Sequence, residues 1–219
     1  MFNIHTYKFD EVPCLVNFDL TPFHFTYPPH VRFSVGIHPW SITENWQETF
    51  ALVEAEAEGS EMWAIGECGL DKVSGGDFFT QMEVFKAHIQ LSESLQKPLI
   101  IHCVKAHNEM VSLRQQLEAA CKKEGREPQS WVIHGFRGKP ELAKQLMAKG
   151  IMLSFGHQYN VETLRFVFAT GHPFFLETDD LDLSVRQIYE QVAHHLDVDV
   201  ARLETLCDPL QTVFHRTAF

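Results

Sequence analysis

Four short apolar runs of this sequence each lead into a side chain that can bind a metal ion. The runs cover residues 63–66, 99–101, 131–133 and 174–178, and the residues that follow them are Glu67, His102, His134 and Asp179. A buried imidazole or carboxylate without a partner is costly, so four of them at one face need a shared partner. A divalent metal ion supplies one, and nitrogen and oxygen ligands suit zinc and related first-row ions. The sequence therefore predicts a metal site, in which the carboxylate of Glu67 can bridge two ions.

Two further histidines end apolar runs. His5 closes the first run and is a candidate fifth ligand. His38 closes the third run and faces the same end, where it is a candidate for substrate contact. An ordinary turn packed by the neighbouring Trp40 explains His38 about as well.

Eight apolar runs are the candidate strands that must position these residues. They cover residues 1–5, 14–18, 32–37, 62–67, 98–102, 131–134, 151–155 and 173–177. From the fourth run onward the intervening segments have helical spacing, as in residues 76–96 and 106–124. The first two connections are too short for ordinary helical crossovers.

Strands that alternate with helices predict parallel pairing, and eight of them can close into a (β/α)8 TIM barrel, whose active site lies at the carboxyl ends of the strands. We expect one compact domain over residues 1–219, with shortened first βα units. A doubly wound open sheet is the second choice, because Gly75-Gly76 does not follow a strand directly as a nucleotide-binding turn would.

The composition limits the partners. The chain has 219 residues, 45% of them hydrophobic, and a formal charge of −11, which opposes binding to phosphate backbones unless positive charge is concentrated locally. The five cysteines are scattered and form no C-x-x-C pair, which suits a reducing cytoplasm. No apolar stretch is long enough to span a bilayer, and nothing in the sequence implies a protein partner.

Several strand-end motifs together resemble those of the TatD-like metal-dependent deoxyribonucleases. The segment 64–71, Ala-Ile-Gly-Glu-Cys-Gly-Leu-Asp, is similar to the family's G-E-x-G-L-D strand. The later segments 100–102, 134–138 and 177–179 resemble its I-H, H-C-F-S-G and E-T-D signatures in the same order, and residues 35–39 match as well.

This resemblance implies a barrel with two divalent ions, zinc first and manganese, magnesium or nickel as alternatives, that hydrolyses phosphodiester bonds with an activated water. Carried over by position, His5 and Asp179 bind one ion and His102 and His134 the other. Glu67 bridges them, and Asp179 also accepts the proton of the attacking water. A nucleic acid or a small phosphodiester is the implied substrate.

The chain departs from the family pattern at its first and fifth runs. The opening D-x-H-x-H is here Asn3-Ile4-His5-Thr6-Tyr7, so a phenol replaces one histidine and should weaken the first metal site. Val104 stands where the family has an arginine, and Lys105, Arg137 and Lys139 can replace that contact only if they point inward. Arg137 is the candidate substrate contact among them.

Three functions are compatible with these features. The first is a working hydrolase acting on phosphodiesters or on another ester or amide. The second is a non-catalytic barrel that keeps its metal and serves as a binding module, which Tyr7 and Val104 favour and Asp179 disfavours. A barrel phosphatase of the polymerase-and-histidinol-phosphatase type fits less well, because the later H-x-H pairs of that type are missing.

Overall fold

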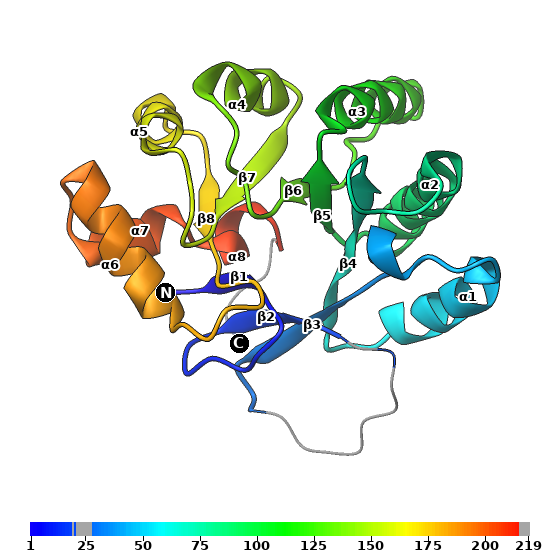
Figure 1. Cartoon of the computed structure of the whole chain (residues 1–219), viewed down its shortest axis with the longest axis horizontal. Helices are drawn as coiled ribbons and strands as arrows, with labels where there is room; N and C mark the ends of the chain where they lie inside the picture. Colours follow the sequence, from blue (N-terminus) through cyan, green and yellow to red (C-terminus); the bar gives the residue numbers. More distant parts are fainter. Residues whose placement is uncertain (19, 21–27, 215–219) are drawn as a thin grey trace.

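Eight parallel strands form the centre of the structure, paired in sequence order from β1 to β8 (Figure 1). The computed structural model describes residues 1–18, 20 and 28–214. The strands are β1 (Asn3–Thr6), β2 (Cys14–Asn17), β3 (Val31–Val35), β4 (Met62–Asp71), β5 (Leu99–Val104), β6 (Trp131–Ile133), β7 (Ile151–Phe155) and β8 (Phe174–Leu176). All eight predicted strands are therefore confirmed. The alternative, a doubly wound open sheet, is wrong, because its strand order would depart from the sequence order and the order observed here does not.

Most of the helices lie around the outside of the strands, whereas the last one packs against apolar residues inside the ring (Figure 1). They are η1 (Pro39–Ser41), α1 (Trp46–Ala57), α2 (Phe78–Leu95), α3 (His107–Lys123), α4 (Pro140–Met147), α5 (Val161–Thr170), α6 (Val185–Leu196), α7 (Val200–Leu206) and α8 (Pro209–Thr212). The segment between β1 and β2 contains no helix, as expected from its length. None of the helices formed by the described residues is long and apolar enough to cross a membrane.

Two apolar clusters divide the core. The larger one fills the space between the strands and the helices, and the smaller one joins residues from β1 to β8 that point inward. Ile100 and Val132 belong to the inner cluster. Because side chains two positions apart lie on the same face of a strand, His102 and His134 point inward as well, beyond this apolar layer.

Polar side chains close the ring of strands between β8 and β1. The pairing there is a single parallel bridge between Thr6 and Asp179. The side chain of Asn3, which is fully buried, donates to Oγ1 of Thr178 at 2.9 Å and accepts from the Thr178 backbone N–H at 3.2 Å. Asn3 thus supplies two hydrogen bonds to a junction that has little backbone pairing of its own.

We predict that Asn3→Ala lowers the free energy of unfolding by about 1–3 kcal/mol, because it leaves buried groups of Thr178 without their partner. Urea denaturation measures this value. The matched control is Asn45→Ala, since Asn45 is exposed and makes no capping hydrogen bond to α1. Equal losses in the two variants would contradict the role given to Asn3.

Candidate metal centre

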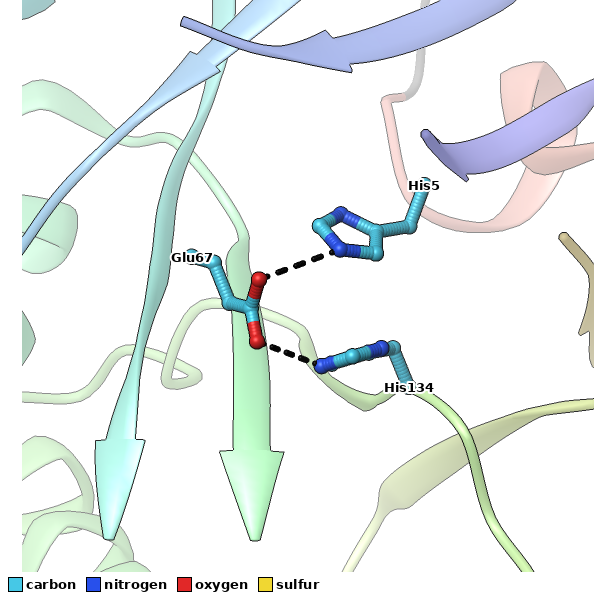
Figure 2. A group of neighbouring side chains, drawn as sticks. All are labelled: His5, Glu67 and His134. Atoms are coloured by element: carbon cyan, nitrogen blue, oxygen red, sulfur yellow. Dashed lines mark hydrogen bonds and ion pairs between the residues drawn. The ribbon is translucent and has the colours of Figure 1, made fainter. Parts of the chain in front are cut away.

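The carboxylate of Glu67 is the point on which the histidines converge. Glu67 is 2% exposed, and its Oε1 lies 2.7 Å from Nε2 of His134, 3.1 Å from Nδ1 of His102 and 3.1 Å from Nε2 of His38. Its other oxygen, Oε2, lies 3.2 Å from Nε2 of His5. Figure 2 shows His5 and His134 on opposite oxygens of the carboxylate. The structure thus brings together four of the five predicted metal ligands, and it places His38, which was predicted as a substrate contact, against the same carboxylate.

The backbone of β4 holds Glu67 in this position. Gly66 precedes it with a φ of +134°, and a Cβ there would lie 2.3 Å from the carbonyl oxygen of Ile100 on β5. Only glycine allows the two strands to approach so closely. On the other side, the Glu67 backbone N–H donates to Oδ1 of Asn17 at 2.7 Å.

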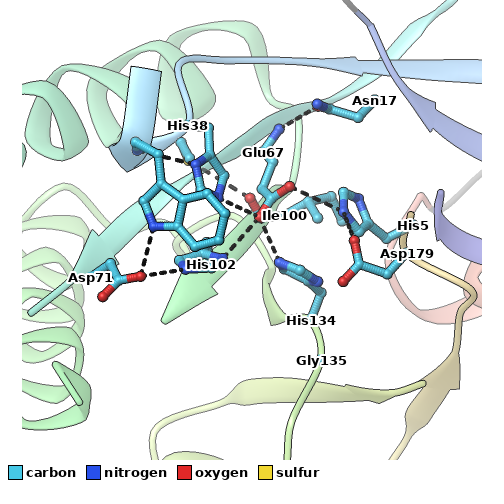
Figure 3. Close-up of polar contacts among 12 residues, drawn as sticks. His5, Asn17, His38, Glu67, Asp71, Ile100, His102, His134, Gly135 and Asp179 are labelled. Carbon is cyan, nitrogen blue, oxygen red and sulfur yellow. Dashed lines mark hydrogen bonds and ion pairs between the residues drawn. The ribbon is translucent and has the colours of Figure 1, made fainter. Parts of the chain in front are cut away.

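A second carboxylate orients His102. Nε2 of His102 lies 3.2 Å from Oδ2 of Asp71, which leaves Nδ1 facing Glu67 (Figure 3). Burial raises the pKa of Asp71, but hydrogen bonds from Ser74, Trp40, Val73 and His102 lower it to about 2. An ionised Asp71 keeps the ring proton of His102 on Nε2, so the lone pair of Nδ1 is free for a metal ion.

His134 has a similar arrangement. Its Nδ1 lies 3.4 Å from Oε1 of Glu177, a fully buried carboxylate that also accepts from the Gly135 backbone N–H at 2.7 Å. Burial lowers the pKa of His134, but Glu67 and Glu177 outweigh it and raise the pKa well above the usual value. The metal-free ring therefore carries a proton on both nitrogens, and an ion bound at Nε2 would displace that proton and leave the other on Nδ1, toward Glu177.

Sequence reasoning assigned no role to Asp71 or Glu177. Both residues stand in motifs that resemble those of the TatD-like family, because Asp71 closes the segment 64–71 and Glu177 opens the segment 177–179.

His38 serves Glu67 in a different way. Its Nδ1 accepts a hydrogen bond from the Trp40 backbone N–H at 3.1 Å. A backbone N–H can only donate, so the proton of the neutral ring must sit on Nε2, the nitrogen that faces Glu67. His38 is therefore suited to donate to Oε1 of Glu67, and it lacks the free lone pair that a metal ligand needs at that position.

Tyr7 meets the opposite oxygen of Glu67. Its hydroxyl donates to Oε2 at 2.5 Å. Burial and the charge of Glu67 raise the pKa of Tyr7, so the phenol stays neutral and acts as a donor. The residue that replaces the family's second histidine is thus at the site and hydrogen-bonds directly to the carboxylate of Glu67.

Asp179 lies at the rim, beside His5. Its Oδ1 is 3.7 Å from Nε2 of His5, and 36% of its side chain is exposed. The backbone fixes this position, since the Asp179 N–H donates to the carbonyl of His5 and its own carbonyl accepts from the Tyr7 N–H, each at 3.1 Å. Burial raises the pKa of Asp179 more than His134 and His5 lower it.

These donors fit divalent ions. Two groups have ligand atoms close enough to share an ion, His5 with Glu67 and His134, and His38 with Glu67 and His102. His5 is completely buried, and neither of its ring nitrogens has a hydrogen-bond partner within the described structure. A bound ion would satisfy His5. In these groups, His134 shares an ion with His5, and His102 with His38, so they differ from the predicted pair of His102 with His134. The predicted pair is still compatible with the ring orientations, because both rings turn a nitrogen toward Oε1 of Glu67.

A cavity of about 960 Å³ opens directly onto this cluster. Lys105 and Arg137 line it and are exposed, so two of the three cations considered from the sequence border the site. Lys139 is not among the lining residues. Val104 lines the cavity as well, where it adds no charge.

Comparisons with known proteins agree with this architecture. A family model described as TatD related DNase matches residues 22–208. The chain is 32% identical over 133 residues to a protein named 3'-5' ssDNA/RNA exonuclease TatD from Erwinia tasmaniensis, which covers 58% of this chain and 47% of that protein. An uncharacterized metal-dependent hydrolase from Buchnera aphidicola is 29% identical over 197 residues, which covers 84% and 71%. The chain spans about half the length of the curated TatD exonucleases it matches.

A solved structure is similar over nearly the whole chain. The TatD homologue YjjV from Escherichia coli superimposes with a TM-score of 0.68 at 15% sequence identity, covering 93% of this chain and 86% of that one. This similarity confirms the barrel fold.

If Glu67 bridges the ions, Glu67→Ala should lose most of the bound metal. Metal analysis by mass spectrometry after reconstitution should find one or two ions per chain in the parent protein. Glu48→Ala is the matched control, because Glu48 is an exposed acid in the first turn of α1. Finding no metal in the parent protein after reconstitution would reject the site.

Replacing Tyr7 tests the first metal position separately. Tyr7→His supplies an imidazole beside His5 and should tighten the weaker of the bound ions, as measured by competition with a chelator. Tyr7→Phe is the control, since it removes the donor to Glu67 without adding a ligand. Equal metal affinities in Tyr7→His and Tyr7→Phe would mean that residue 7 does not reach the ion.

Proposed function

Because the chain belongs to the TatD-related DNase family, we propose that it is a divalent-metal-dependent hydrolase that cleaves phosphodiester bonds of single-stranded DNA or RNA. One observation carries this proposal: a ring nitrogen of His102 and one of His134 both face Oε1 of Glu67, and all three residues line the cavity. The names of the relatives, an exonuclease and a metal-dependent hydrolase, support the same chemistry.

The ligand set favours zinc. Imidazole nitrogens suit zinc and nickel, whereas manganese and magnesium prefer oxygen ligands. His102 and His134 would hold one ion with Oε1 of Glu67. His5 and Asp179 would hold a second ion with Oε2, at the position where Tyr7 now donates to that oxygen. The second position should be the weaker one.

A divalent ion in this site would lower the pKa of water and stabilise the negative charge that develops on the phosphoryl oxygens. Asp179 is the side chain best placed to accept the proton of the attacking water. It borders the cavity, and 36% of its side chain is exposed, so a water molecule can reach it.

The remaining side chains position these groups and the substrate. Asp71 and Glu177 keep His102 and His134 in the orientation that binds an ion, and His38 steadies Oε1 of Glu67. Arg137 would contact a substrate phosphate, since it is the exposed guanidinium on the cavity wall. A binding module would not need a partly exposed carboxylate poised beside the ligands, so hydrolysis remains the preferred function.

A cytoplasmic location is part of the proposal. None of the five cysteines forms a disulfide. Four of them are buried, namely Cys14, Cys68, Cys121 and Cys207. Free buried thiols suit a reducing compartment.

The test of the reaction is Asp179→Asn in metal-reconstituted protein. Loss of a positioned base should lower the rate of oligonucleotide cleavage by about 100-fold or more. Urea stability should remain close to the parent value, and the ion held by His102 and His134 should stay bound, whereas the ion held by His5 and Asp179 should bind more weakly. Asp182→Asn is the matched control, since its side chain is 98% exposed and pairs with Lys8 on the surface.

The substrate panel should include single-stranded and duplex oligonucleotides, a phosphomonoester, a carboxylic ester and an amide. Undiminished cleavage by Asp179→Asn would remove Asp179 from the role of base. A parent protein that is fully loaded with metal and hydrolyses the ester or amide but no phosphodiester would reject the substrate class.

A further inference from the structure

Trp40 is an exposed aromatic residue at the edge of the metal centre. It lines the cavity, and 60% of its surface is accessible. A single exposed aromatic side chain is common on a protein surface, but Trp40 lies on the wall of the cavity and is fixed there by hydrogen bonds.

Hydrogen bonds hold Trp40 at two points. Its indole N–H donates to Oδ2 of Asp71 at 2.8 Å, and its backbone N–H donates to Nδ1 of His38 at 3.1 Å. Asp71 is itself fixed, because its Oδ1 accepts from the backbone N–H groups of Val73 and Ser74 at 2.7 and 2.9 Å. The indole ring is therefore held in place before any ligand arrives.

The same contacts place the ring next to two histidines of the site, His38, which donates to Glu67, and His102, a proposed metal ligand. The ring centroid of Trp40 lies 4.8 Å from that of His38 and 5.5 Å from that of His102. In a nucleotide, only one sugar separates the base from its phosphate. A base that rests on Trp40 would thus keep its own phosphate within reach of the ion held by His102.

We propose that Trp40 is a stacking platform for an unpaired nucleobase and selects single-stranded ends as substrate; this inference rests on the proposed nucleic-acid hydrolase function. Aromatic rings bind bases of any sequence, because every base has a π face, and stacking is a main source of affinity for single strands. A base inside a duplex is already stacked and paired, so it cannot use the platform without being unpaired first.

The cavity offers few cations to a polyanionic ligand. Lys105 and Arg137 line the same cavity as Trp40 and are exposed. The acids Glu67, Asp179 and Asp180 line it too. The chain as a whole carries a formal charge of −11, which repels a polyanion elsewhere. With few cations available, base stacking has to supply a large share of the binding free energy.

The experiment measures the affinity of metal-loaded protein for a short, internally labelled phosphorothioate oligothymidylate, which resists cleavage. A second oligonucleotide of the same length carries abasic residues at both ends. Fluorescence anisotropy gives Kd for the parent protein and for Trp40→Leu, Trp40→Phe and Phe79→Leu. Phe79 is the matched control, because it is 71% exposed and does not line the cavity.

Trp40→Leu should raise Kd for the intact oligonucleotide by roughly 5- to 150-fold. It should leave Kd for the abasic oligonucleotide unchanged, because that ligand has no terminal base to stack. Trp40→Phe keeps an aromatic face and should lose less, and Phe79→Leu should lose nothing. The metal content of each variant reports whether Asp71 and His102 keep their arrangement.

Equal loss with intact and abasic ligands would overturn the inference, since it would mean that Trp40 only supports Asp71 and His102. Unchanged affinity in Trp40→Leu would overturn it too. In both cases the parent protein would still bind and cleave single strands, so the proposed function would stand. A parent protein that neither binds nor cleaves any nucleic acid when loaded with metal would reject that function, and the stacking role with it.

Discussion

The buried carboxylate of Glu67 and the histidines around it are the interaction on which the site depends. A carboxylate that is 2% exposed loses most of its hydration, and it is tolerated only because positive or donor groups replace that hydration. Burial raises the pKa of Glu67, yet His134, His5 and His102 lower it far more. Each of these histidines comes from a different strand end, so the centre forms only when the barrel closes.

The closing of the ring of strands between β8 and β1 explains why β1 contains so many polar residues. Asn3 and Thr178 join β1 to β8 by side-chain hydrogen bonds, and the backbone of Asp179 pairs with His5 and Tyr7 at the same junction. The seam that closes the ring therefore also sets the position of Asp179 relative to His5. Asn3 stands where the TatD-like pattern has an aspartate, and in this chain its amide stabilises the junction of β1 with β8.

The strands and the residues at their ends could be predicted because both depend on local patterns. Short apolar runs separated by amphipathic segments give the barrel, and a barrel brings strand ends together. Helix α1 was not predicted, since its apolar stripe is only Trp46, Phe50, Val53 and Ala57 among many acids. The tautomers of His38 and His102 could not be predicted, because the partners that set them, the Trp40 backbone and Asp71, become their neighbours only in the folded chain.

The two departures from the family pattern act on different parts of the reaction. Tyr7 donates to the oxygen of Glu67 that a second ion would need, so it competes with that ion through the bridging carboxylate. Val104 leaves the cavity wall without a cation at that position, and Lys105 and Arg137 are the nearest replacements along the lining. In a chain of charge −11, ions bound at the proposed site would carry much of the positive charge that the proposed phosphodiester substrate meets. Metal loading and substrate affinity would then be linked, and a phenol that weakened one ion would also weaken the attraction for the substrate.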